Sequence, residues 1–339
     1  MRSLLPLFVL AACSSSETPL TNATSLECPT PGALPFRLTS SGFQKAVNQT
    51  LVKDDPRNKD QASDTLGSTT VSASVYLADD QAPGPAGVAY HGVKARTAPG
   101  AGLQSTPLAG EVVSLWQYDP GPMKWFMLGG GVTDGNGQYD IAGPGITVNG
   151  QARYAMLEAD GSCAAHYDFL LKAGSKVVVT DIDGTLTASD GELLSQLTDI
   201  TYVPKIMGAA DKMLQAWAQK GYPIIYLTAR THVLRMESRL WLDDIGAPTG
   251  PLITANGGKN DDVYKTLWMN RMIHDFGWNV VAAYGNADTD ITAYKNAGVP
   301  DTLIFTVGPL AGSRGTIAIA GNDFTQHINT FVSAQPANQ

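Results

Sequence analysis

Two aspartates, Asp181 and Asp183, are separated by one residue and follow the apolar run VVV and Thr180 in the segment VVVTDIDGTLT. Carboxylates this close repel each other, so the pair either marks a polar turn or shares a cation. If they do chemistry, one carboxylate can attack an electrophile while the other moves a proton. Mg²⁺ suits such a pair because it takes hard oxygen ligands and bridges carboxylate and phosphate groups.

Further polar residues follow other apolar runs of the chain. In chain order they are Thr228 and Arg230 in LTAR, Lys265 at the start of a predicted helix, and Asn286 and Asp290 in GNADTD. In an open parallel sheet, ligands bind beyond the carboxyl ends of the strands. We therefore expect these residues to converge with Asp181 and Asp183 on one edge of a sheet.

The elements that must position these residues follow from the hydrophobic pattern after Gly174. Continuous apolar runs predict buried strands at VVV (177–179), PIIYL (223–227), PLI (251–253), VVAAY (280–284) and LIFTV (303–307). Amphipathic patterns between the runs predict three helices, marked by Ile206, Met213, Leu214 and Trp217, by Val233, Leu234, Leu240 and Trp241, and by Val263, Leu267, Met272, Ile273 and Phe276. Such alternation predicts a Rossmann-like α/β domain whose parallel sheet has helices on both faces.

These motifs, in this order, resemble those of the haloacid dehalogenase superfamily of aspartyl-phosphate phosphotransferases. The resemblance implies that Asp181 is the nucleophile and that Asp183 protonates the leaving alkoxide and then activates water. It further implies a set of phosphate-binding residues, namely Gly184, Thr228 and Lys265, with Thr185 and Arg230 as candidate pocket residues. For Arg230, a structural ion pair is an equal alternative.

The same resemblance implies a Mg²⁺ site. Its ligands would be Asp181, the backbone carbonyl of Asp183, Asn286 and also Asp290. Asn286 departs from the commonest pattern of the superfamily, GDxxxD, which has an aspartate at that position. Residues 186–222 are enough for one loop and one helix, which predicts a minimal cap and an open site.

The stretch GNADTDITAYKNAGVPDTLIFTVGP, together with DIDGTLT and GYPIIYLTAR, resembles the lipin-type phosphatidate phosphatases over about residues 175–310. Lipins hydrolyse phosphatidate to diacylglycerol and phosphate with Mg²⁺. The related domain of phosphatidylinositol-transfer proteins lacks acidic residues of the first motif and senses phosphatidate without cleaving it. The presence of both Asp181 and Asp183 favours an enzyme, a phosphoric monoester hydrolase. A phosphatase for a soluble periplasmic phosphoester and a non-catalytic phosphatidate- or phosphoinositide-binding module are the alternatives.

Residues 67–173 differ from the predicted phosphatase domain at 174–335. Short alternating strands separated by Gly, Pro and Asp turns predict a small antiparallel β-sandwich. The stretch GGGVTDGNG is typical of a hairpin rather than a phosphate or calcium loop, because no helical pattern follows it. Whether Cys163 pairs with Cys28 is open.

The N-terminus, MRSLLPLFVLAAC, has an apolar run too short to span a bilayer and typical of an export signal. Residues 10–13 resemble a bacterial lipobox, in which residues 1–13 are the signal and Cys13 becomes the lipidated first residue. An ordinary signal peptide is the alternative. Residues 14–66 comprise a Ser-, Thr- and Pro-rich tether and an ambiguous polar segment. The resemblance implies a chain exported and lipid-anchored to the bacterial cell envelope, where it meets phospholipid substrate.

Composition limits the remaining functions. The chain has 339 residues, 43% of them hydrophobic, which is enough apolar material for two domains. Its formal net charge of −8 argues against nucleic-acid binding, because no basic stripe could offset phosphate repulsion. A small pocket for one phosphate remains compatible with this charge, and the sequence leaves protein partners unknown.

Overall fold

The computed structural model describes residues 173–198, 202–231, 235–255 and 261–338, and before them ten strands and short turns between residues 65 and 171. The predicted export signal, Cys13 and Cys28 lie outside the described residues. Most of the predicted tether does too, except that the first strand begins at Thr65, two residues before the predicted start of the sandwich.

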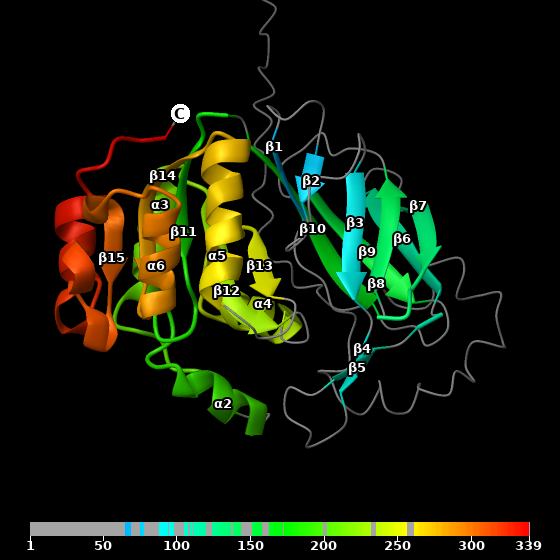
Figure 1. Cartoon of the computed structure of the whole chain (residues 1–339), viewed down its shortest axis with the longest axis horizontal. Helices are drawn as coiled ribbons and strands as arrows, with labels where there is room; N and C mark the ends of the chain where they lie inside the picture. Colours follow the sequence, from blue (N-terminus) through cyan, green and yellow to red (C-terminus); the bar gives the residue numbers. More distant parts are fainter. Residues whose placement is uncertain are drawn as a thin grey trace, which may run out of the picture.

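The described part of the N-terminal domain is made of strands (Figure 1). They are β1 (Thr65–Ser68), β2 (Val75–Leu77), β3 (Val88–Val93), β4 (Ala95–Thr97), β5 (Ser105–Pro107), β6 (Val112–Asp119), β7 (Lys124–Val132), β8 (Gln138–Gly143), β9 (Gln151–Leu157) and β10 (Cys163–Leu171). Six form a sheet in the order β2-β1-β10-β9-β6-β7, and β3-β8 and β4-β5 form two-stranded sheets. β8 also lies against β6 and β7, where Val113, Tyr139 and Ile141 are buried.

The described strand pairs before residue 172 are antiparallel with one exception, β1 and β10, which run parallel. The parallel pair is possible because many residues separate the two strands, whereas a hairpin joins only antiparallel neighbours. The stretch GGGVTDGNG forms the end of β7 and the turn before β8, and Asn136 donates to the Asp134 side chain there. The stretch therefore forms a turn between two strands, as expected, but not a hairpin, because β7 pairs with β6 whereas β8 pairs with β3.

The second domain is built on a six-stranded parallel sheet in the order β13-β12-β11-β14-β15-β16. Its strands are β11 (Lys176–Thr180), β12 (Ile224–Thr231), β13 (Leu252–Ala255), β14 (Asn279–Gly285), β15 (Ile304–Thr306) and β16 (Ile317–Ala318). The first five coincide with the five predicted apolar runs. The predicted Rossmann-like α/β domain, preceded by a small β domain, is thus confirmed.

Helices cover both faces of this sheet. On one face lie α5 (Asp261–Asn270), the following π-helical turn η5 (Arg271–Asp275) and α6 (Asp288–Asn296), and Figure 1 shows α5 and α6 side by side. On the other face lie α3 (Ala210–Gln219), α4 (Arg235–Asp244) and the C-terminal pair α7 (Thr325–His327) and η10 (Ile328–Val332). Alternate strand residues feed the two cores, so Val177 and Val179 pack on the first face and Val178 on the second.

Several elements were not predicted. α2 (Gly191–Thr198) lies within 186–222, so this segment holds two helices rather than one, and Figure 1 shows α2 set apart from the other helices. Short 3₁₀ turns surround β15 and the edge strand β16, namely η6 (Asp301–Leu303), η7 (Gly308–Leu310), η8 (Ser313–Gly315) and η9 (Ala320–Asn322). Among the described residues, no helix combines the length and apolarity needed to cross a membrane.

Candidate active site

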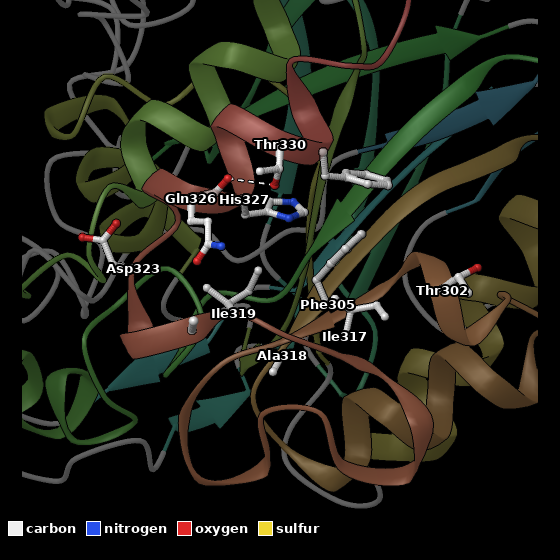
Figure 2. A pocket seen from close by; sticks show the side chains of 11 residues that line it. Thr302, Phe305, Ile317, Ala318, Ile319, Asp323, Gln326, His327 and Thr330 are labelled. Atoms are coloured by element: carbon white, nitrogen blue, oxygen red, sulfur yellow. Dashed lines mark hydrogen bonds between the residues drawn. The ribbon is translucent and has the colours of Figure 1, made fainter.

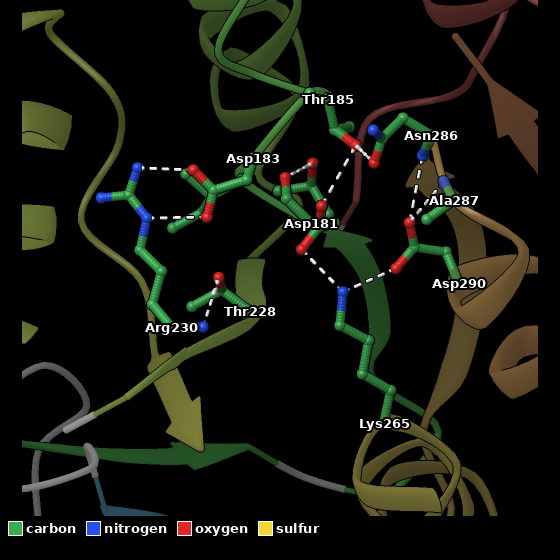
Figure 3. A network of polar contacts seen from close by, with 12 residues as sticks. Asp181, Asp183, Thr185, Thr228, Arg230, Lys265, Asn286, Ala287 and Asp290 are labelled. Atoms are coloured by element: carbon green, nitrogen blue, oxygen red, sulfur yellow. Dashed lines mark hydrogen bonds and ion pairs between the residues drawn. The ribbon is translucent and has the colours of Figure 1, made fainter. Parts of the chain in front are cut away.

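β11 carries Asp181 to the carboxyl edge of the parallel sheet (Figure 3). Four consecutive strand residues before it are buried, and Asp181 itself is 4% exposed. The Asp181 backbone N–H donates to the Tyr284 carbonyl at 3.0 Å, which joins the end of β11 to the end of β14. The strand therefore places a carboxylate in an interior position, where its charge needs partners.

Lys265, on the first turns of α5, is the main partner of Asp181. Its Nζ donates to Asp181 Oδ1 at 2.7 Å and to Asp290 Oδ1 at 2.6 Å, and all three side chains are buried. The second Asp290 oxygen accepts from the backbone N–H groups of Asn286 and Ala287, each at 3.0 Å. Asp290 therefore fixes both Lys265 and the start of α6.

This network shifts two ionisation equilibria. Burial raises the pKa of Asp181 to about 7; Asp290 and Asp183 add to this rise, and Lys265 opposes it. Burial alone would lower the pKa of Lys265, but the charges and hydrogen bonds of Asp181 and Asp290 raise it above its ordinary value. Lys265 is thus held as a cation against the carboxylate predicted to be the nucleophile.

Asp183 is held by Arg230, which lies near the end of β12. The guanidinium Nε and Nη2 donate to the two Asp183 oxygens, each at 2.8 Å, in a bidentate pair. Nη1 donates to Ser238 Oγ at 3.0 Å. Of the two roles considered for Arg230, the structure shows the ion pair. Thr228 is fully buried between these groups, and its hydroxyl accepts the Arg230 backbone N–H at 3.2 Å.

Thr185 joins the first motif to the last one. Its hydroxyl lies 3.3 Å from Asp181 Oδ2 and 3.2 Å from Asn286 Oδ1. One neutral hydroxyl therefore serves two acceptor oxygens, which brings the two predicted ligand oxygens close together. The structure thus gathers the predicted residues Asp181, Thr185, Lys265, Asn286 and Asp290 into one network.

Gly184 lies in the left-handed region at φ +67°, which favours glycine. A Cβ atom there would collide with the side chains of Asn286 and Asp190. Its backbone N–H, predicted to bind phosphate, donates to Thr187 Oγ1 at 2.9 Å. The phosphate-binding role of Gly184 stays a prediction, and the structure shows a different need for glycine at this position.

Asp190 is a site residue that the sequence reasoning missed. Its Oδ1 accepts a hydrogen bond from Asn286 Nδ2 at 2.9 Å, although 96 positions separate the two residues. The sequence signal was the short Ser-Asp pair that follows DIDGTLT. Such a pair looks like an ordinary helix start, so only the fold could reveal its partner.

The donor chemistry of the site fits a divalent cation. Among the residues that the structure describes, the four carboxylates of Asp181, Asp183, Asp190 and Asp290 lie in this network with two cationic side chains, Arg230 and Lys265. Across the described residues, no three His, Cys, Asp or Glu side chains gather closely enough to hold a metal ion by themselves. A cation here would draw on Asp181 Oδ2, Asn286 Oδ1 and main-chain oxygen, which are hard oxygen donors suited to Mg²⁺.

Comparison with known proteins adds a family context. Residues 178–308 match the model of the LNS2 domain of PITM 1-3. Protein retinal degeneration B of Drosophila melanogaster is 29% identical over 232 residues, 67% of this chain and 18% of that protein. Membrane-associated phosphatidylinositol transfer protein 3 of Mus musculus is 28% identical over 211 residues, 61% of this chain and 21% of that protein.

A second group of relatives is named for an enzymatic activity. Phosphatidate phosphatase LPIN2 of Homo sapiens is 32% identical over 172 residues, 44% of this chain and 19% of that protein. The chain thus spans about a fifth of the length of these relatives. A solved structure of a Pnkp1/Rnl/Hen1 complex matches 39% of this chain with a TM-score of 0.34 and 19% identity, too low to support any equivalence. The α/β domain is therefore similar to the domain that lipins and these transfer proteins share.

Proposed function

We propose that the α/β domain is a Mg²⁺-dependent phosphatase that hydrolyses a phosphomonoester carried by a membrane lipid, with phosphatidate as the leading substrate. The observation that carries the proposal is the joint presence of Asp181 and Asp183 at the end of β11, with Lys265 bonded to Asp181. Relatives named phosphatidate phosphatases support the substrate class. Relatives named transfer proteins make a binding module the main alternative.

In the proposed reaction, a carboxylate oxygen of Asp181 attacks the phosphorus and forms a P–O bond. The ester P–O bond breaks, and the leaving alkoxide takes a proton from Asp183. Asp183 then accepts a proton from water, whose oxygen attacks the phosphorus and releases Asp181 and phosphate. Both steps use the side chains of Asp181 and Asp183, so the two residues must lie close together, and only one residue separates them in the sequence.

The surrounding residues orient these two groups. Lys265 donates to Asp181 Oδ1, and the Thr185 hydroxyl lies against Oδ2, so the two contacts together fix the orientation of the Asp181 carboxylate. Both Asp183 oxygens are bonded to Arg230, so proton transfer requires one of these bonds to open. A substrate phosphate is the natural competitor for Arg230, because guanidinium groups bind phosphate as they bind carboxylate.

When bound, Mg²⁺ would offset the charge of the phosphate facing these carboxylates and polarise its oxygens. The chain residues that would hold it are Asp181, Asn286 and the main-chain carbonyl of Asp183. Asp290 would support the site without binding the cation, because its oxygens already accept hydrogen bonds from Lys265 and from two backbone N–H groups.

The test is phosphate release from phosphatidate in mixed micelles, with and without Mg²⁺. Asp181→Asn should abolish release, whereas Asp288→Asn should not, because Asp288 is an exposed carboxylate paired with Arg314. Release from soluble phosphoesters but not from phosphatidate would favour the soluble-substrate alternative. Phosphatidate binding without release by the wild type would favour the binding module.

We also propose that the chain is exported and anchored to the bacterial cell envelope through Cys13. An anchor would keep the site near the membrane and so raise the effective concentration of membrane-borne substrate at the site. Metabolic labelling with a radioactive fatty acid should mark the wild type but not Cys13→Ser. An unlabelled wild-type chain would remove the anchor from the proposal without affecting the chemistry.

A further inference from the structure

We propose that Asp190 is the positioning residue for Asn286, and that it carries the negative charge that the commonest superfamily pattern places at position 286 itself. The inference deepens the proposed function and rests on it, because the site that Asn286 would complete is the Mg²⁺ site. In this chain the aspartate of GDxxxD is an asparagine, and a carboxylate stands directly behind its amide.

The contacts of Asn286 show why its amide needs a partner. Oδ1 lies 3.2 Å from Thr185 Oγ1, on the side of Asp181, and Nδ2 lies 2.9 Å from Asp190 Oδ1. A carboxylate accepts hydrogen bonds and donates none, so Asp190 requires the NH₂ end of the amide to face it. The oxygen end must then face Asp181, where a cation ligand is needed.

The chemical difference between the two ligand types makes this orientation decisive. An aspartate presents an oxygen to a cation whichever way its carboxylate turns. An asparagine has one oxygen and one NH₂ group, and a half-turn would place N–H donors where the ligand belongs. Residues outside the ligand set that orient a ligand typically contribute about 10–100-fold to metal affinity. Asparagine at position 286 therefore requires a neighbouring residue that fixes the orientation of its amide, whereas aspartate would not.

The backbone is shaped around this contact. A Cβ atom at Gly184 would collide with Asn286 Nδ2 and with Asp190 Oδ1, the two atoms that form the hydrogen bond. Gly184 belongs to the same motif as Asp181, so the Asn286–Asp190 pair packs directly on the catalytic loop. The pair is thus built into the site, even though Asp190 is exposed.

A competing role for Asp190 is to cap α2, which begins at the next residue. Aspartate is a favoured capping residue, and its loss there would cost about 1 kcal/mol of stability. Capping predicts a small stability change and no dependence on residue 286. Positioning predicts a metal-affinity change that depends on whether residue 286 is asparagine or aspartate.

The experiment is a double-mutant cycle in the full chain, with Mn²⁺ as the probe and electron paramagnetic resonance as the measure of binding. We expect Asp190→Ala to weaken Mn²⁺ binding about tenfold or more. In the Asn286→Asp background, the same substitution should change Mn²⁺ affinity less than about threefold, because a carboxylate needs no orientation. Thermal unfolding of each variant checks that the chain is folded.

Equal losses in both backgrounds, or no loss in either, would overturn the positioning role and leave Asp190 as a cap. A wild-type chain that binds no Mn²⁺ would overturn the positioning role and the metal site together. A wild type that binds Mn²⁺ and follows the predicted cycle, but releases no phosphate, would support the positioning role while refuting the proposed function.

Discussion

His327 makes the folding stability of this chain depend on pH. The residue is 8% exposed, and its Nε2 lies 2.8 Å from the Tyr284 hydroxyl, which accepts the Trp217 indole N–H at 2.7 Å. An indole only donates, so the Tyr284 proton is free to donate to His327. The neutral imidazole then carries its proton on Nδ1. Figure 2 shows the His327 ring near Phe305 in the cavity beside β15.

The size of the effect follows from the two ionisation equilibria. Burial lowers the pKa of His327 from 6.5 to about 4. Between these values the unfolded chain binds a proton that the folded chain does not, so the stability is fully present above pH 6.5 and is lost as the pH falls towards 4. Linkage gives a loss of about 3 kcal/mol in the free energy of unfolding between pH 7 and pH 4.

The assay is urea unfolding at pH 7 and pH 4 for the wild type and for His327→Phe. The variant retains an aromatic ring against Phe331, whose centroid lies 5.2 Å from that of His327, but it cannot titrate. Carboxylates elsewhere titrate in both proteins, so their effects on the free energy of unfolding cancel when the two losses are subtracted. We expect the wild type to lose about 3 kcal/mol more than the variant. Equal losses, or an imidazole that titrates near 6.5 by NMR, would refute the reasoning.

Three further substitutions probe the site itself. Lys265→Met leaves buried carboxylates without their cation, so urea unfolding at pH 7 should show a loss of about 3–5 kcal/mol; a loss under about 1 kcal/mol would contradict the ion-pair network. Arg230→Lys keeps the charge but not the bidentate contact with Asp183, so kcat for phosphate release should fall at least about tenfold, since general acid–base catalysis contributes about 10²–10⁴-fold. An unchanged kcat would show that Asp183 needs no such partner. Gly184→Ala should destabilise the chain by about 1–3 kcal/mol in urea unfolding, because the residue has a positive φ and no room for Cβ; a neutral effect would mean that the loop shifts freely.

Much of the α/β domain could be predicted because its signals are local. Five buried strands appear as continuous apolar runs, and each run ends where polar residues begin. The edge strand β16 was not predicted although it begins the short apolar stretch IAIA (317–320), because the strand has only two residues, Ile317 and Ala318, and both are exposed. The helix α2 was not predicted either. Its Leu194 is exposed, so this residue does not mark a buried helix face in the sequence.

The site was predicted to the extent that its residues follow strands. The positions of Asp181, Thr228 and Asn286 were found because each lies within two residues of the end of an apolar run. Their partners could not be derived in the same way, since hydrogen bonds such as Asn286 to Asp190 join segments far apart in the chain. The competing roles of Arg230 needed coordinates as well, because a guanidinium suits a carboxylate and a phosphate equally.

The central claim is that Asp181 forms a covalent bond to the transferred phosphoryl group. Phosphatidate carrying ³²P in its phosphate should be mixed with the full chain and Mg²⁺, quenched in acid within a single turnover, and the peptides examined. We expect ³²P on the peptide that contains Asp181, stable to acid, released by hydroxylamine, and absent from Asp181→Asn. Phosphate release by the wild type with no ³²P on this peptide, or undiminished release by Asp181→Asn, would contradict the account.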